Sequence, residues 1–170
     1  MNSFSILIMA LLFSQMPVES VVASLNNRAI TYSELLQEGE LLNIENNVPP
    51  ETPLSADLKK QVLKLLIFRI ITFEEARSQE VTIDEKLINQ KVETYRKNIY
   101  MKNFLAKYDI SDLEFKTIIK MRLTADKMTE LFLEKRFKEK DPSAAEKKKA
   151  IEDWQENLFK RQKLLEYPIP

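Results

Sequence analysis

The sequence predicts a mainly α-helical fold, a compact bundle of about five to six helices with a minor β element. Three observations predict it. The 170 residues contain a single glycine, whereas sheet-rich folds use glycine for turns and bulges. A Ser or Thr followed three residues later by Glu, a pairing typical of helix N-termini, recurs along the chain. Between these pairs, apolar residues recur at helical spacing or form long runs.

The first twenty residues have the pattern of a secretory signal peptide. Residues 4–13 form a run that is apolar except for Ser5, and this run is too short for a membrane span of about 20 residues. Val18 and Ser20 stand at −3 and −1 of a bond where cleavage is expected. No Lys or Arg precedes the run, so a buried helix or an uncleaved anchor is the alternative. We expect a cleaved signal peptide at 1–20, a domain at 21–170, and no membrane span after cleavage.

The β element is expected to join the two ends of this domain. Residues 21–25 (VVASL) are partly β-branched, and the two asparagines that follow tolerate turn conformations. A very short second strand is expected at 29–30. Prolines keep the end of the chain extended, because proline breaks a helix. The segment 166–169 is therefore expected to lie against the strand 21–25.

Capping signals predict where the helices begin. The expected helices are 32–43 after Thr31, 56–79 after Ser55, one through Ile99 after Thr82, one to about Lys138 after Ser111, and a last one from Pro142 with Asp141 as its N-cap.

Apolar patterning predicts which helix faces are buried. The segment 62–73 (VLKLLIFRIITF) is apolar nearly all round, so it is expected at the centre of the bundle. It is too short to span a membrane, and Lys64 and Arg69 interrupt it. On the helix after Thr82, the buried stripe is expected at Ile88, Val92, Tyr95 and Ile99. On the last helix, the buried face is expected at Ile151, Trp154, Leu158 and Leu165.

The composition excludes several classes of functional site. The chain has no His and no Cys, so it lacks an imidazole base, a thiolate nucleophile and the usual zinc ligands. A single glycine cannot supply a phosphate-binding loop or a dinucleotide fingerprint. The 26 basic and 26 acidic residues balance, which argues against a nucleic-acid partner. Adjacent carboxylates such as Glu74 and Glu75 point about 100° apart on a helix, so they form no catalytic pair. We expect a protein that is no enzyme and has no metal or cofactor.

Several segments, in order, resemble one known family. VVASLNNRAITYSEL resembles the opening strand, turn and first helix of the N-terminal domain of SurA-type periplasmic chaperones. LKKQVLKLLIFRIITFEEARSQEVTIDEKLINQKVE resembles that domain's central helix and the next capped helix, and FLAKYDISDLEFKTIIKMRLTADKM resembles its loop and long helix. The likeness covers about 21–137. The C-terminal AIEDWQENLFKRQKLLEYPIP is similar to the helix and strand that complete the same domain.

The resemblance implies a chaperone core without isomerase activity. Family members usually carry one or two parvulin peptidyl-prolyl isomerase domains before the C-terminal helix, whereas here the five residues 139–143 connect the helices. The resemblance implies an N-terminal part at 21–140 and a completing helix and strand at 142–170. It also implies a periplasmic location and unfolded outer-membrane or secreted proteins as clients, and it leaves room for a separate envelope folding factor as a partner. Arg28, Glu80 and Asp109 occupy turn positions where the family often has glycine.

Flexible methionine and aromatic side chains are the candidates for binding such clients, because they adapt to many sequences. Each could instead belong to the core. Tyr100, Met101 and Phe104 are favoured because they follow the regular stripe of their helix. The full set of candidate client-binding residues is Tyr95, Tyr100, Met101, Phe104, Tyr108, Met121, Met128 and Phe132.

Two alternatives to a general chaperone follow from the same residues. A core of this kind could act as an envelope adaptor or assembly factor that binds one dedicated folded partner. For the segment 135–149, with seven basic and three acidic residues, a solvated junction between two helices is the favoured explanation, and contact with an anionic lipid or a client is the alternative.

Overall fold

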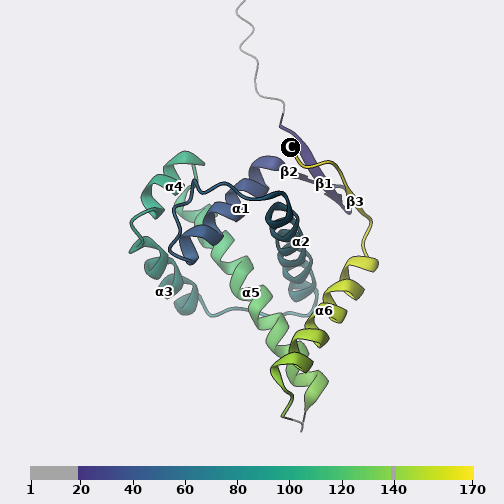
Figure 1. Ribbon diagram of the computed structural model, residues 1–170. Helices are drawn as coiled ribbons and strands as arrows, with labels where there is room; N and C mark the ends of the chain where they lie inside the picture. The colour runs from purple at the N-terminus through teal and green to yellow at the C-terminus, as the bar shows by residue number, and fades with distance from the viewer. Residues whose placement is uncertain (1–18, 139–140) are drawn as a thin grey trace, which may run out of the picture.

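A computed structural model describes residues 19–138 and 141–170 (Figure 1). Residues 1–18 of the expected signal peptide lie outside the described residues. The described chain forms six helices and one three-stranded antiparallel sheet, which confirms the predicted fold class. In chain order the elements are β1 (Val21–Leu25), β2 (Arg28–Thr31), α1 (Tyr32–Glu45), α2 (Ala56–Ser78), α3 (Glu85–Arg96), α4 (Met101–Lys107), α5 (Asp112–Phe137), α6 (Ala144–Lys160) and β3 (Leu164–Glu166).

The sheet has the strand order β2-β1-β3, so the two ends of the described chain lie side by side (Figure 1). Asn26 and Asn27 make the turn between β1 and β2 with φ of 49° and 75°, a conformation that asparagine tolerates better than most residues. β3 pairs with β1 through Ser24 opposite Leu165. The predicted pairing of the N-terminal strand with the C-terminal segment is confirmed, although the strand begins at Leu164 rather than near residue 166.

Local capping interactions set the helix starts. Thr31 with Glu34 and Ser111 with Glu114 form complete capping boxes, as expected. The start expected at Thr82 was wrong. Asp84 caps α3 instead, accepting a hydrogen bond from the Lys86 amide at 2.8 Å, because its carboxylate lies closer to the first free amides.

The expected start of the last helix was also wrong. α6 is capped by Ser143, not by Asp141, and Ser143 forms a further capping box with Glu146.

Two turns lie at positions where the resembled family often has glycine. Glu80 and Asp109 have φ of 55° and 49°, the left-handed conformation that glycine favours past a helix end. The chain therefore keeps this geometry without glycine at either position.

Gly39 allows a close approach inside the fold. It lies within α1, and a Cβ at this position would collide with the side chain of Leu54. Glycine therefore lets α1 pack directly against the loop that precedes α2, which accounts for a glycine in the interior of a helix.

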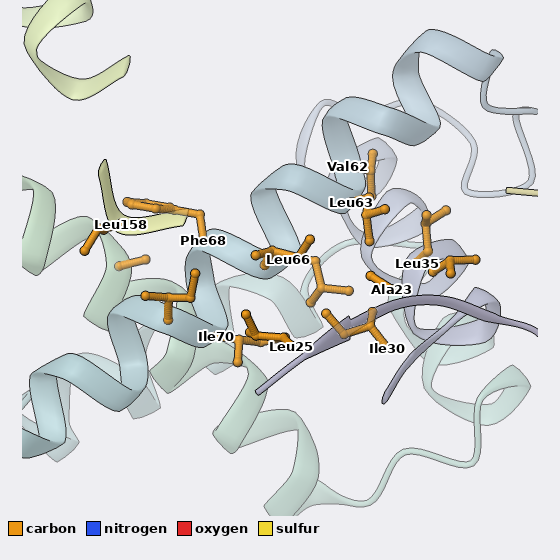
Figure 2. Packing of buried hydrophobic residues seen from close by; sticks show 14 residues of the cluster. Ala23, Leu25, Ile30, Leu35, Val62, Leu63, Leu66, Phe68, Ile70 and Leu158 are labelled. Atoms are coloured by element: carbon orange, nitrogen blue, oxygen red, sulfur yellow. The ribbon is translucent and has the colours of Figure 1, made fainter. Parts of the chain in front are cut away.

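The core consists of two clusters that share α1 and α5. The sheet-side cluster gathers β1, β2, α1, α2 and α6, and in Figure 2 Val62, Leu63 and Leu66 of α2 face the sheet residues. The helix-side cluster joins the C-terminal part of α1 to α3, α4 and the first half of α5. Its buried members are Leu41, Ile44, Ile88, Val92, Tyr95, Met101, Phe104, Phe115 and Ile119.

The central position predicted for 62–73 is confirmed, because most of this segment is buried in the sheet-side cluster. Two other predictions about burial were wrong. Ile99 is 81% exposed, since α3 ends at Arg96 and the stripe does not continue. Leu165 is 61% exposed, since it belongs to β3 and not to the last helix. Within the described residues, no helix is long and apolar enough to cross a membrane.

Candidate functional site

The eight candidate client-binding residues divide into two groups. Tyr95, Tyr100, Met101, Phe104 and Tyr108 lie on α3 and α4 or directly beside them, and the other three lie on α5. Four of the eight have buried side chains, which a ligand can reach only if the core opens. These four are Tyr95, Met101, Phe104 and Met128.

Two of the three favoured residues, Met101 and Phe104, are buried, and they lie on α4, a short helix that the sequence did not predict separately. Its short turn rotates Met101 and Phe104 inward, where each is only 1% exposed. The structure assigns both to packing in the helix-side cluster. Tyr100, Tyr108, Met121 and Phe132 are half-buried and keep part of their surface accessible.

A buried ion-pair network lies beside Tyr95 and joins four helices. Arg122 of α5 donates to Glu38 at 2.8 Å and to Glu45 at 2.6 Å, both on α1. Arg69 of α2 also pairs with Glu38. The Tyr95 hydroxyl donates to Glu45, and burial together with this hydrogen bond raises the pKa of Tyr95 well above the usual tyrosine value. Burial and the neighbouring Arg122 charge lower the pKa of Arg69.

This network is structural in character. Both of its arginines are held by carboxylates, and the side chains of Arg122 and Glu38 are each only 5% exposed. A buried pair of this kind fixes how helices meet, since removing one partner leaves an uncompensated charge. The sequence signal for this network is that Arg69 interrupts the apolar run 62–73 and that Arg122 follows the apolar residues Ile118 and Ile119.

An open groove lies between α5 and α6, where the two helices extend away from the rest of the fold (Figure 1). Phe132 of α5 stacks on Trp154 of α6 with ring centroids 4.6 Å apart and planes 6° apart. Trp154 also meets Phe68 of α2 edge-on at 5.4 Å. Both stacked rings are half-buried. The groove encloses about 530 Å³ and is lined by Phe132, Arg136, Ala150, Asp153, Trp154, Glu156, Asn157, Lys160 and Arg161.

The groove continues toward the junction between the two helices. A second hollow of about 440 Å³ shares Arg136, Ala150 and Asp153 with the first, and Phe137 and Ala145 also line it. Together the two hollows are lined by residues from Phe132 to Phe137 of α5 and from Ala145 to Arg161 on and just after α6. Such a surface can accept an extended chain rather than a compact small molecule.

The charges on the rim of the groove are only partly paired. Asp153 pairs with Lys149 at 2.9 Å, and Glu156 pairs with Lys160 at 2.9 Å. The side chains of Arg136 and Arg161 make no ion pair or hydrogen bond within 19–138 and 141–170. Both residues are exposed, so their side chains are accessible to an anionic group.

The sequence of this chain matched no model of a known protein family, and it matched no curated protein. Within the part of the chain that the structure describes, no group of three or more His, Cys, Asp or Glu side chains is placed to hold a metal ion. The α5–α6 groove is therefore identified from its own geometry. Phe132 was expected from the sequence, whereas Trp154 was expected only as part of the buried face of its helix.

Proposed function

We propose that this protein is a periplasmic chaperone, or holdase, that binds unfolded outer-membrane or secreted polypeptides in the α5–α6 groove without catalysing a reaction. The observation that carries the proposal is the open groove with the stacked Phe132 and Trp154 rings on its wall. Aromatic surface in an open groove can contact apolar side chains of many shapes, because the burial of apolar area is not directional.

The arrangement of the surrounding elements supports the same function. β3 and α6 return to complete the sheet-side cluster, as the resemblance to SurA-type chaperones implies for residues 21–137 and the C-terminal helix and strand. The proposed export through a signal peptide at 1–20 would bring the domain to the compartment where such clients occur. Holding rather than tight binding is expected, since half-buried rings offer limited apolar area.

The test is suppression of aggregation. Light scattering is recorded after a denatured outer-membrane protein is diluted into buffer with the purified chain at equimolar ratio. Wild type should suppress most of the scattering, and the Phe132→Ala/Trp154→Ala double variant should suppress much less, because it removes both rings of the groove. Circular dichroism confirms that the double variant is folded.

The matched control changes apolar surface elsewhere. Ile99 and Leu113 are 81% and 76% exposed and lie outside the groove, so Ile99→Ser/Leu113→Ser should suppress aggregation as wild type does. Equal scattering with and without wild-type protein would contradict the proposal. A single stoichiometric folded partner recovered from envelope extract, with no β-barrel precursors, would favour the adaptor instead.

A further inference from the structure

We infer, as a deepening of the proposed holdase function, that the α5–α6 groove selects client segments in which acidic residues flank an aromatic residue. The central observation is that Arg136 and Arg161 line the same groove as Phe132 and Trp154 and make no ion pair with any other described residue. The rim carries three cations against two anions, and both anions already pair with lysines. The groove therefore presents unneutralised positive charge next to aromatic surface.

The positions of the two arginines follow from helix geometry. Arg136 comes four residues after Phe132 and Arg161 comes seven residues after Trp154, so each lies near the face of its own helix that carries the ring. Because the chain reverses between α5 and α6 (Figure 1), Arg136 lies toward the helix junction and Arg161 toward the sheet. At a rise of about 1.5 Å per residue, the two arginines begin about 6 Å and about 10 Å along the helices from the stack.

This spacing predicts the sequence pattern of the client. An extended chain advances about 3.3 Å per residue and places alternate side chains on the same face, so a carboxylate two residues to either side of an aromatic ring shares its face and can reach a guanidinium. Arginine suits this role because its planar group donates two parallel hydrogen bonds to one carboxylate. The aromatic ring of the client would meanwhile contact the exposed edge of the Phe132–Trp154 pair.

Trp154 makes the inference directly measurable, because it is the only tryptophan in the sequence and lies on the groove wall. Its fluorescence in the purified full chain is titrated with a short peptide that has one central phenylalanine and an aspartate two positions away on each side. Matched peptides carry asparagine or lysine in place of both aspartates. The aspartate peptide should bind about fivefold more tightly than the asparagine peptide, as two partly exposed charge pairs allow, and the lysine peptide should bind most weakly.

Two double variants, each of which removes two positive charges, show whether the preference for aspartate depends on the groove arginines or on the net charge of the protein. Arg136→Gln/Arg161→Gln should remove the preference for aspartate and leave binding of the asparagine peptide unchanged. Lys135→Gln/Lys163→Gln changes two exposed cations that do not line the groove, so it should keep the preference. Equal binding of the aspartate and asparagine peptides by wild type, or no response of Trp154 to any peptide, would overturn the inference.

Two further outcomes separate the proposed preference for acidic segments from the proposed holdase function. Suppression of aggregation without a preference for the aspartate peptide would support the holdase function and reject the preference. A preference for the aspartate peptide without suppression of aggregation would support the preference and reject the holdase function. Vesicles containing phosphatidylglycerol should leave Trp154 fluorescence unchanged. A response to these vesicles but not to the aspartate peptide would assign the arginines to a lipid surface and reject the peptide.

Discussion

The two ends of α5 lie in contrasting surroundings although they belong to one continuous helix. In its first half, Phe115 and Ile119 are fully buried in the helix-side cluster, and Arg122 is held inside the ion-pair network. In its last part, residues 131–137, no side chain is buried. The first half packs with residues of α1, α3 and α4, whereas in the last part Phe132 stacks on Trp154 of α6.

The difference shows which part of α5 has accessible side chains that could bind a ligand. Side chains enclosed on all sides contribute to stability and cannot also bind a ligand, because ligand contact requires accessible area. The open end of α5 keeps aromatic and cationic groups accessible while the closed end holds the helix in place. Stability and binding should therefore separate along α5, and the following substitutions test that separation.

The largest expected difference is between two phenylalanines of α5. Phe115→Ala should lower the free energy of unfolding by about 4 kcal/mol, because it leaves a cavity in a fully enclosed site. Phe132→Ala should lower it by about 1 kcal/mol, since mainly the stacking contact with Trp154 is lost. Urea denaturation followed by circular dichroism measures both values. Equal losses would show that the open end of the helix is as tightly packed as the closed end.

The second comparison uses two arginines of the same helix. Arg122→Met should cost about 3 kcal/mol, because it leaves Glu38 and Glu45 without one of their buried partners. Arg136→Met should change the free energy of unfolding by less than about 0.5 kcal/mol, as expected for an exposed side chain with no ion pair to another described residue. The same urea experiment applies. A stable Arg122→Met variant would mean that the network contributes little to holding α1 against α5.

The smallest expected effect is the change in the free energy of unfolding with pH that comes from two tyrosines of the helix-side cluster, Tyr95 and Tyr108. Burial, with the nearby Glu45 and Glu40 carboxylates respectively, raises the pKa of Tyr95 and of Tyr108 above the usual value near 10. In the unfolded chain both ionise near pH 10, whereas in the folded chain they stay protonated. Their contribution to stability is therefore present below pH 10 and is lost as the pH rises above it.

Absorbance at 295 nm and urea denaturation at pH 9 and pH 11 measure this effect. Wild type should lose more stability between the two pH values than the Tyr95→Phe/Tyr108→Phe double variant, and the two absorbance titrations should differ only above pH 10. If the difference instead appears below pH 10, these hydroxyls are accessible and the closed end of the fold is less tightly packed than described.

Predictions from sequence succeeded where the physics is local. The capping boxes at Thr31 and Ser111 and the asparagine turn after β1 depend on a few neighbouring residues. At Thr82 the prediction failed although the pattern was the same, because Asp84 offered a carboxylate closer to the helix start. The predicted burial of Ile99 was wrong for a related reason. Its spacing from Tyr95 fits a helix, but α3 ends at Arg96.

The candidate site was predicted only in part. Phe132 was included, but Met101 and Phe104 were favoured and belong to the core, because α4 turns them inward. No local pattern distinguishes an aromatic residue that faces a core from one that faces a groove. The pairing of Phe132 with Trp154 joins residues 22 positions apart on two helices, so it depends on how those helices meet.

By itself the sequence determined the class of this protein: helical, with a small sheet joining its two ends, with no histidine or cysteine and with a single glycine. These properties follow from composition, caps and periodicity, which act over a few residues. Tertiary structure decided which charges are enclosed and which are free. Arg122 and Arg136 are the same type of residue and lie on the same helix, α5. However, Arg122 is buried and pairs with carboxylates of α1, whereas Arg136 lines an open groove. Burial depends on the elements packed around a residue, and that information is not local.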